Sequence, residues 1–225
     1  MLFLALDSSA TASVALGRIE GGQLTLLAHR ATADTRSHAE VMSPFVADVL
    51  AEAGVSGNDL DAVLTGTGPG PFTGLRAGIV TARALALAWN LPLYGMMSLT
   101  ALAEAAHAVA REAGQQRFLV ASDARRCEVY SALYELTETG YSLVQGPTVG
   151  PASQTPTLPA YGVGTSLYPQ DFDVQPGFES LQPEASHLLR AAARLGASAL
   201  STDTSALYLR ESDAKVPAAR KKAGS

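Results

Sequence analysis

The order in which apolar runs change their spacing most constrains the fold of this chain. Three short runs near the N-terminus have the length and the turn signals of β-strands, and they cover residues 2–7, 12–19 and 24–31. Helical and strand-like segments then alternate, with a short buried strand over 61–68, a second helix over 74–90, a strand over 91–96 and a third helix that Ser98 caps and that ends at about Gly114. This order predicts a mixed α/β domain.

The first helical segment has two candidate starts. Ser37 and Glu40 have the spacing of a capping box, whereas Ser43 followed by Pro44 places proline at the first helical position. The helix therefore begins at Ser43, or Pro44 kinks a longer helix that ends at Gly54.

The second half of the chain begins much as the first half does. Residues 117–134 repeat the order of an apolar strand, an aspartate, a turn and a second apolar strand, so that Asp123 corresponds to Asp7. Any β-hairpin with an aspartate turn would give the same match, so internal duplication and chance similarity both stay open. Residues 145–159 read as a surface loop, 161–164 as a short strand and turn, and 183–196 as a helix.

Together these segments predict two α/β domains of the duplicated actin-like and sugar-kinase-like type. We expect a first domain over 1–105, a second and smaller domain over 106–210, and a solvated tail over 211–225 that ends in ARKKAGS. That fold normally holds ATP between its halves, with the phosphates near the two aspartate turns.

Composition limits the classes of partner. The net charge of −5 argues against a chain that grips nucleic acid by itself, since phosphate binding rests on lysine and arginine. Cys127 is the only cysteine, which excludes an internal disulfide and a thiolate zinc cage. No apolar run approaches the length of a membrane span, and the N-terminus lacks the basic start of a signal peptide, so we expect a cytoplasmic protein without membrane contact.

The glycine-rich stretch TGTGPGPFTGLRAG (65–78) resembles a phosphate loop but fails the tests for one. It has no Walker-type lysine, and neither frame of G-x-G-x-x-G is complete. We predict instead a structural turn in which Gly68 and Gly70 adopt unusual backbone angles and Thr73 caps the helix that starts at Gly74. The alternative is an anion site at the start of that helix.

The sequence contains none of the common motifs for a catalytic metal or a catalytic nucleophile. The four histidines do not form a metal-binding helix face, and no G-x-S-x-G nucleophile elbow is present. We therefore predict no catalytic residues, no metal and no cofactor.

The second helix has a face almost without side chains. Gly74, Gly78, Ala82 and Ala86 are four residues apart, although glycine inside a helix costs about 1 kcal/mol relative to alanine. Such a face permits close approach of another backbone, and the chain's own sheet is favoured over a partner's helix. Because the helix is apolar most of the way round, it also predicts a surface for assembly together with the first helix.

Five stretches resemble the TsaB (YeaZ) family of accessory subunits in bacterial tRNA threonylcarbamoyladenosine biosynthesis. They are LALDSSATASVAL, RSHAEVMSP, TGTGPGPFTGLRAGIVTARALALAWNLPLYGMMSLTALA, SDARRCEVY and ALYLRESDAK, and GPGPFTGLR is the most specific. The resemblance is weakest over 145–200. The catalytic paralogue TsaD has a histidine pair after the strand that follows its glycine block, where this chain has residues 97–101 without histidine.

The resemblance implies a non-catalytic scaffold that pairs with TsaD through helices of its first domain, while TsaD transfers the threonylcarbamoyl group to the adenosine next to the anticodon of ANN-decoding tRNAs. It further implies a homodimer when the chain is alone, the ATPase TsaE as a further member of the complex, and only indirect contact with tRNA. Carried onto this sequence, the partner-binding residues are His38, Val41, Phe45, Arg76, Ile79 and Arg83. A stand-alone actin-like ATPase or kinase and a metallopeptidase-like protein are the alternatives.

Overall fold

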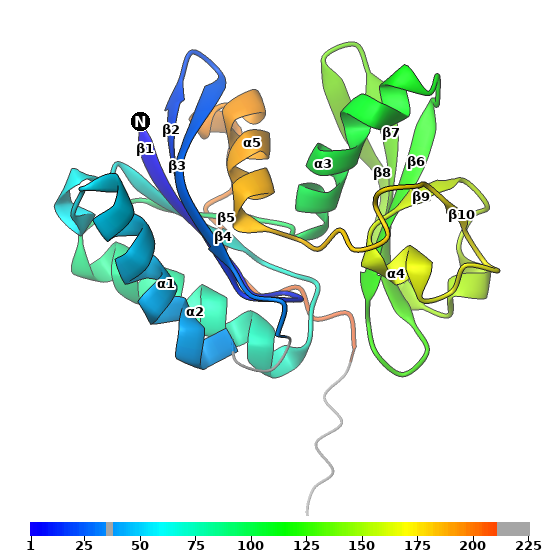
Figure 1. Cartoon of the computed structure of the whole chain (residues 1–225), viewed down its shortest axis with the longest axis horizontal. Helices are drawn as coiled ribbons and strands as arrows, with labels where there is room; N and C mark the ends of the chain where they lie inside the picture. The colour runs from blue at the N-terminus through cyan, green and yellow to red at the C-terminus, as the bar shows by residue number, and fades with distance from the viewer. Residues whose placement is uncertain (35–37, 211–225) are drawn as a thin grey trace, which may run out of the picture.

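Two five-stranded sheets with helices between and around them make up the protein (Figure 1). The computed structural model describes residues 1–34 and 38–210, except for the side chain of His38. The predicted tail over 211–225 and the capping box at Ser37 therefore lie outside the described residues. Within the described part of the chain, no helix is long and apolar enough to cross a membrane.

The first sheet has the strand order β3-β2-β1-β4-β5. Its strands are β1 (Leu2–Asp7), β2 (Ser13–Glu20), β3 (Gln23–Ala31), β4 (Ala62–Gly66) and β5 (Leu93–Met96). β1 pairs antiparallel with β2 and parallel with β4, so it is the central strand. Its residues are buried on both faces, as expected for a strand whose sheet is covered on both sides.

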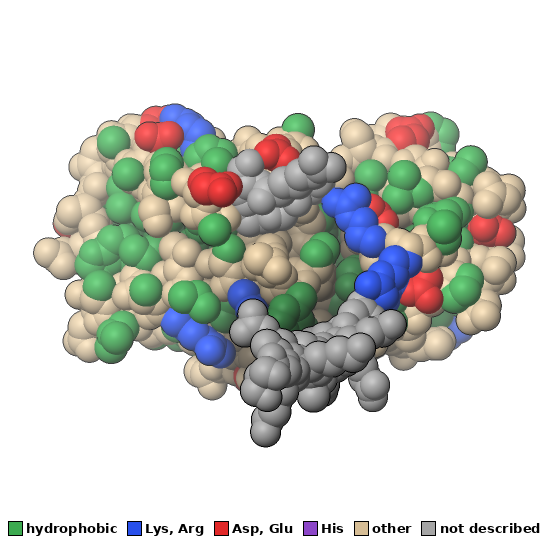
Figure 2. Space-filling view, turned by 90° about the horizontal axis from the view of Figure 1, so that it is seen from below, with side chains coloured by type: hydrophobic (Ala, Val, Ile, Leu, Met, Phe, Trp, Pro, Cys, Tyr) green, Lys and Arg blue, Asp and Glu red, His purple; other side chains and the backbone are tan. Residues whose placement is uncertain are grey.

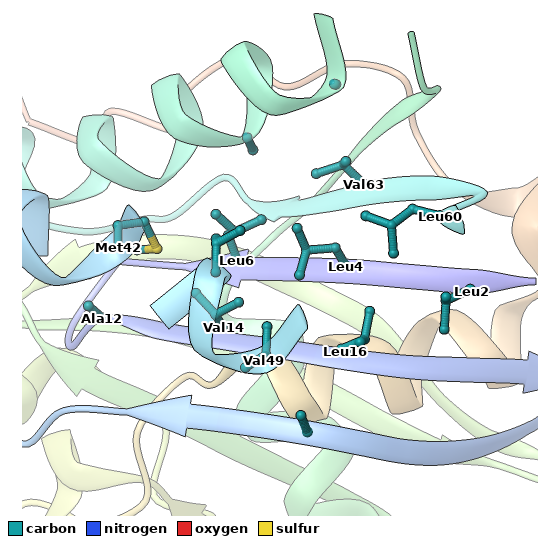
Figure 3. Close-up of a cluster of buried hydrophobic side chains, with 14 residues drawn as sticks. Leu2, Leu4, Leu6, Ala12, Val14, Leu16, Met42, Val49, Leu60 and Val63 are labelled. Atoms are coloured by element: carbon teal, nitrogen blue, oxygen red, sulfur yellow. The ribbon is translucent and has the colours of Figure 1, made fainter. Parts of the chain in front are cut away.

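Helices α1 (His38–Ala53) and α2 (Phe72–Ala88) cover one face of this sheet (Figure 1). Leu4, Leu6 and Val14 from the sheet pack with Met42 and Val49 from α1 in the buried cluster drawn in Figure 3. Of the two starts predicted for α1, the earlier one is correct, because the helix begins before Ser43 and contains Pro44 in its interior. The short helix η1 (Gly57–Asp59) connects α1 to β4.

The other face of the first sheet is covered by α5 (Ala185–Leu195), which comes from the far end of the chain. Phe3 and Ala5 of β1 pack with Leu188, Leu189 and neighbouring alanines of α5. α5 also packs against α3 (Leu99–Glu112), so these two helices lie between the sheets (Figure 1). The short helix η3 (Ala197–Ala199) follows α5.

The second sheet repeats the topology of the first, in the order β8-β7-β6-β9-β10. Its strands are β6 (Arg117–Asp123), β7 (Val129–Thr137), β8 (Gly140–Gly150), β9 (Pro159–Tyr161) and β10 (Asp173–Val174). β6 pairs antiparallel with β7 and parallel with β9, as β1 does with β2 and β4. Asp7 and Asp123 each end the first strand of their hairpin. The duplication suggested by the sequence is therefore present in the fold.

α3 packs on one face of the second sheet, and η2 (Ala152–Gln154) and the segment around α4 (Val163–Ser166) lie on the other. The first lobe is the first sheet with α1, α2 and α5, and the second lobe is the second sheet with α4. The predicted division at residue 105 stays a prediction: α3 spans that position, and α5 packs on the first sheet although it follows the second.

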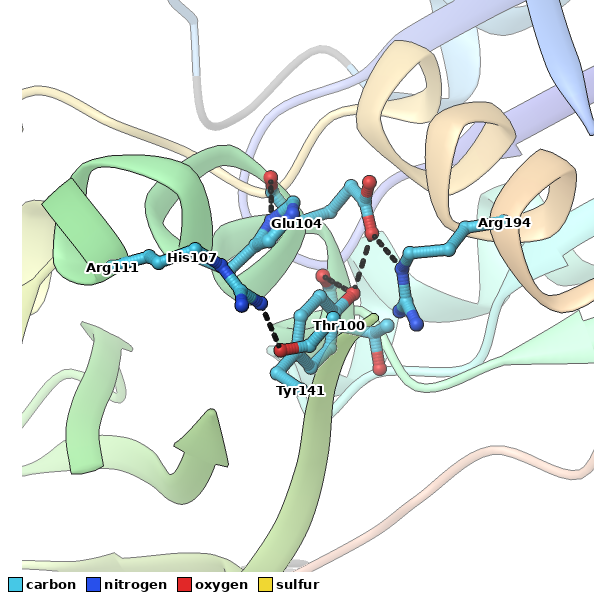
Figure 4. Close-up of polar contacts among 7 residues, drawn as sticks. Thr100, Glu104, His107, Arg111, Tyr141 and Arg194 are labelled. Carbon is cyan, nitrogen blue, oxygen red and sulfur yellow. Dashed lines mark hydrogen bonds and ion pairs between the residues drawn. The ribbon is translucent and has the colours of Figure 1, made fainter. Parts of the chain in front are cut away.

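A polar cluster joins the two lobes (Figure 4). Glu104 of α3 accepts a hydrogen bond from the Tyr141 hydroxyl of β8 at 2.8 Å and an ion-paired one from Arg194 Nε of α5 at 3.2 Å. The Arg194 guanidinium lies 4.1 Å from the centre of the Tyr141 ring. Arg111 donates to the carbonyl oxygens of Thr137 and Gly140 in the β7–β8 turn.

Three predictions, on β8, α3 and α4, are wrong. Residues 163 and 164, predicted as part of a turn, begin the short helix α4. Residues 145–150 belong to β8 and are not loop, because β8 pairs along most of β7 despite two irregularities in register. Ser98 precedes α3 as predicted but makes no side-chain cap, because its hydroxyl is used elsewhere, by Asp7 and Gly68.

Candidate functional site

The turn after β1 holds the glycine-rich stretch in place. Asp7 is fully buried, and its Oδ1 accepts hydrogen bonds from the backbone N–H and the hydroxyl of Ser9 at 2.8 and 2.6 Å. Its Oδ2 accepts from the Ser98 hydroxyl at 2.6 Å, and that hydroxyl in turn accepts from the N–H of Gly68. A Cβ on Gly66 would collide with the same carboxylate. The aspartate thus links β1, the end of β4 and the start of α3.

Ser8 connects the same turn to α2. Its hydroxyl donates to the carbonyl of Gly74 at 2.7 Å and accepts from the N–H of Gly78 at 2.9 Å. A Cβ on Gly78 would collide with this hydroxyl, so only glycine permits the approach. Gly74, Gly78, Ala82 and Ala86 are all buried. The small-residue face of α2 therefore packs on the chain's own sheet, which is the favoured of the two sequence interpretations.

The four residues predicted to form the structural turn have different surroundings. Gly68 has a φ of +91° and precedes a cis proline, and Gly70 lies against the backbone of Ser9. α2 begins at Phe72 after Pro71, without a side-chain cap, so the prediction that Thr73 caps the helix is wrong. Thr73 is exposed and Gly74 is buried. The anion site at this helix start stays a prediction.

The second aspartate turn is occupied by arginine. Asp123 accepts a hydrogen bond from the backbone N–H of Arg125 at 2.7 Å, and the Arg125 guanidinium forms an ion pair with it at 3.0 Å. Arg125, Arg126 and Cys127 all have positive φ, a conformation that non-glycine residues seldom adopt. Among the residues that the structure describes, no three His, Cys, Asp or Glu side chains could share a metal ion.

The exposed side of α2 carries large apolar side chains. Val80 is 61% exposed and Leu87 is 84% exposed, and Ala84 is exposed between them. Their spacing of four and three residues places them in one stripe, opposite the buried glycines. α1 lies beside α2 on the same layer, where its own outward positions include the small residues Ala47 and Ala51. We call this surface, Val80, Ala84 and Leu87 with Ala47 and Ala51, the helical face.

The partner-binding residues predicted from the family resemblance do not all reach this surface. Val41 and Phe45 are partly buried against the core below α1. Ile79 is only 4% exposed, on the inner side of α2. His38 is the first residue of α1, but its side chain lies outside the described residues. Partner contacts through these four residues stay predictions.

Arg76 and Arg83 are exposed on α2 and bind a segment from the C-terminal part of the chain. Arg76 Nε donates to the Tyr208 hydroxyl at 2.6 Å. Arg83 donates to the hydroxyl and the carbonyl of Thr204, both at 3.0 Å. Residues 201–210, which we call the strap, therefore run beside α2.

Sequence reasoning missed Val80 and Leu87, the most exposed large apolar residues of α2. A signal was present, because they lie on the side of the helix opposite the glycine and alanine stripe, and only one of two opposite sides can face the sheet. Tyr208 was missed for another reason. Its contact with Arg76 joins residues 132 positions apart, and no local pattern predicts such a contact.

The repeated sheet, the two aspartate turns and the helices packed between the sheets define a two-domain actin-like α/β protein. The family model described as TsaD, tRNA N6-adenosine threonylcarbamoyltransferase, matches residues 25–161, which is more than half of the chain. The chain belongs to this family, and within it to the TsaB (YeaZ) branch.

Three comparisons support this assignment. The chain is 38% identical over 215 residues to an uncharacterized protein of Mycobacterium tuberculosis (strain ATCC 25618 / H37Rv), covering 94% of this chain and 93% of that one. It is 43% identical over 105 residues to the tRNA threonylcarbamoyladenosine biosynthesis protein TsaB of Escherichia coli (strain K12), covering 47% and 44%. A crystal structure of an uncharacterized protein with similarity to peptidase YEAZ from Pseudomonas aeruginosa has a TM-score of 0.76 and 32% identity, covering 93% and 99%.

Proposed function

We propose that this chain is a non-catalytic subunit for tRNA threonylcarbamoyladenosine biosynthesis, and that it works by docking its helical face onto a catalytic TsaD paralogue. In this proposal TsaD transfers the threonylcarbamoyl group to the adenosine next to the anticodon of ANN-decoding tRNAs. The similarity to E. coli TsaB and the match to the TsaD family support the pathway.

The observation that carries the docking role is the exposed apolar stripe on α2. Val80 and Leu87 are mostly exposed, although the opposite side of the same helix is packed closely on the sheet. An amphipathic surface helix normally turns polar side chains outward, so two large apolar residues in one outward stripe indicate a covered surface. The small side chains on α1 beside it leave room for a partner's helix to approach.

The state of the two aspartate turns supports a non-catalytic role. In the actin-like fold the phosphates of a nucleotide lie near these turns. Here the Asp7 carboxylate is fully buried and bound by Ser9 and Ser98, and Asp123 is bound by Arg125. An aspartate with these partners can align the backbone, whereas binding a phosphate or its metal ion would first require breaking those bonds.

The other partners follow from the same proposal. The ATPase TsaE joins through the complex, tRNA contacts this chain only indirectly, and the setting is the cytoplasm. Two copies of the chain pair through the helical face when TsaD is absent. The homodimer and the heterodimer then compete for one surface, so adding TsaD should dissociate the homodimer.

The proposal is tested by mixing the chain with the TsaD protein of the same genome. We expect a heterodimer by sedimentation velocity, and threonylcarbamoyladenosine in tRNA by mass spectrometry only when both proteins are present with the remaining pathway enzymes. Val80→Asp and Leu87→Asp each bury a charge at the interface, so each should weaken the heterodimer at least about tenfold and lower modification in proportion.

Leu143→Asp is the matched control, since Leu143 is 47% exposed on β8 in the other lobe, and it should bind TsaD like the wild type. Equal binding by Leu87→Asp and the wild type would show that the helical face is not the docking surface. Modification of tRNA by this chain without TsaD, or tight ATP binding by titration calorimetry that depends on Asp7, would contradict the non-catalytic role.

A further inference from the structure

The strap runs from the edge strand β5, past the end of β4 and along α2, to the second lobe. It begins at a bridge between Ser201 and Gly95, where the Gly95 N–H donates to the Ser201 carbonyl at 2.9 Å. The N–H of Leu207 then donates to the Thr67 carbonyl at 2.9 Å. At its end Arg210 forms an ion pair with Glu128 and donates to the Ala124 carbonyl at 2.9 Å. These contacts fix the strap at both lobes.

Three side chains stack where the strap passes the first turn of α2. The Arg76 guanidinium lies 3.5 Å from the centre of the Phe72 ring and 5.5 Å from that of Tyr208. The two rings are 4.7 Å apart at an angle of 30°. Phe72 and Tyr208 are 43% and 42% exposed, so the stack lies at the surface. Guanidinium groups bind aromatic rings within about 6 Å, and both rings satisfy this limit.

The stack fixes the orientation of the Arg76 guanidinium. Its Nε is taken by the Tyr208 hydroxyl, while the two Nη nitrogens make no hydrogen bond within the described part of the chain. Arg76 also has no carboxylate partner among residues 1–34 and 38–210. A planar guanidinium held in one rotamer, with neither Nη group bonded to residues 1–34 or 38–210, suits two parallel hydrogen bonds to a carboxylate.

The stack is continuous with the helical face. Val80 follows Arg76 by four residues, so the two side chains are neighbours on the exposed side of α2. α2 contains two arginines and no acidic residue. A surface that combines this positive charge with an apolar stripe is complementary to one that carries a carboxylate beside apolar side chains.

We infer that the strap is part of the docking surface, where Arg76 binds a surface carboxylate of the catalytic TsaD paralogue and Phe72 and Tyr208 position the guanidinium. This inference rests on the proposed function and adds the chemistry of the contact. Arginine and tyrosine are enriched among residues that dominate binding energy, and a guanidinium already ordered in the free protein loses less entropy on binding.

The test compares the heterodimer dissociation constants of wild type and strap variants with TsaD of the same genome. Arg76→Ala should weaken binding about tenfold to a hundredfold, and Arg76→Lys should recover only part of it, because an ammonium group cannot form the paired contact. Tyr208→Ala should weaken binding about tenfold, whereas Tyr208→Phe, which keeps the stack, should stay within about threefold. Raising the salt concentration should weaken wild-type binding more than binding of Arg76→Ala.

Arg117→Ala is the matched control, because Arg117 is exposed on β6, where it pairs with Glu135 at the surface. It should leave the dissociation constant unchanged, and the melting temperatures of all variants should stay close to that of the wild type.

The inference is wrong, and the proposed function stands, if Arg76→Ala and Tyr208→Ala bind like the wild type while Leu87→Asp does not. No binding by the wild type would contradict the proposed function itself. If Arg76→Ala dissolves a homodimer but leaves the heterodimer intact, the carboxylate belongs to a second copy of this chain, and the assignment to TsaD is wrong.

Discussion

At the scale of single residues, Asp7 lies at one of the two aspartate turns but has the bonding of a structural residue. Each carboxylate oxygen accepts from at least one serine hydroxyl, and the group is fully buried. Hydrogen bonds to a buried carboxylate are stronger than those between neutral groups. We therefore expect a substitution of Asp7 to lower the free energy of unfolding and to have a smaller effect on tRNA modification.

We predict that Ser98→Ala and Asp7→Asn each lower the free energy of unfolding by about 1–3 kcal/mol, because each leaves a buried polar group without its partner. Urea denaturation measures this loss. Ser43→Ala is the control, since Ser43 is exposed on α1, and it should change stability by less than about 0.5 kcal/mol. The structural role would be contradicted if Asp7→Asn kept wild-type stability and abolished tRNA modification in the reconstituted system.

Single residues also show how far the sequence could predict the candidate site. The four-residue spacing of Gly74, Gly78 and Ala82 correctly indicated a face for close backbone contact, because spacing in a helix determines which residues share a side. It did not say which surface would meet that face. Ile79 was predicted to contact a partner and is buried, whereas Val80 beside it is exposed. The two residues are adjacent on α2, so a small rotation of the helix about its axis decides which of them is buried. The contact between Ser8 and Gly78 fixes that rotation.

At the scale of elements, the order of strands and helices in the first half was predictable because each has a distinct apolar period and clear turn residues. β8 was missed because Pro147 and the glycines around it are typical of loops, and pairing with β7 outweighs that local preference. The position of α5 was not predictable either. Its sequence spacing shows that it has an apolar side but not which sheet that side meets, and in the fold it packs on the first sheet.

The packing of α5 gives a prediction on pH. Burial lowers the pKa of His187, with Glu184 and Glu104 opposing that shift and Arg190 and His29 adding to it. The unfolded chain then binds the proton more readily than the folded one below the usual histidine pKa of about 6.5. Stability conferred by the neutral imidazole is therefore present at neutral pH and is lost as the pH falls below that value.

Urea midpoints of wild type and His187→Gln, measured from about pH 8 to pH 5, should show this difference. The wild type should lose more stability than the variant between about pH 7 and pH 5, since glutamine does not titrate. Parallel profiles for the two proteins would mean that His187 is protonated as easily in the folded state as in the unfolded one.

At the scale of the whole molecule, two polar contacts among the described residues join the lobes, in addition to the packing of α3 against α5. One is the polar cluster of Glu104, Tyr141 and Arg194, whose members come from α3, from the second sheet and from a helix of the first lobe (Figure 4). The other is the strap, with Arg210 at the second lobe. Seen from below, basic side chains lie on both sides of the boundary between the lobes (Figure 2). Such ties would favour the proposed docking, because a surface that does not move costs less to dock.

The polar cluster should be the stronger tie, because the Glu104 side chain is only 8% exposed and the Arg194 side chain 23%. Burial raises the pKa of Tyr141, so its hydroxyl stays protonated and donates to Glu104 at every physiological pH.

Glu104→Gln keeps the shape of the side chain but removes the charge that holds Arg194. We expect a loss of about 1–3 kcal/mol in the free energy of unfolding and faster hydrogen exchange in the β7–β8 turn, which Arg111 of the same helix holds. Glu135→Gln is the matched control, since Glu135 forms an exposed ion pair with Arg117, and it should cost less than about 0.5 kcal/mol. Similar losses for the two variants, with unchanged exchange in that turn, would show that the lobes are held by apolar packing alone.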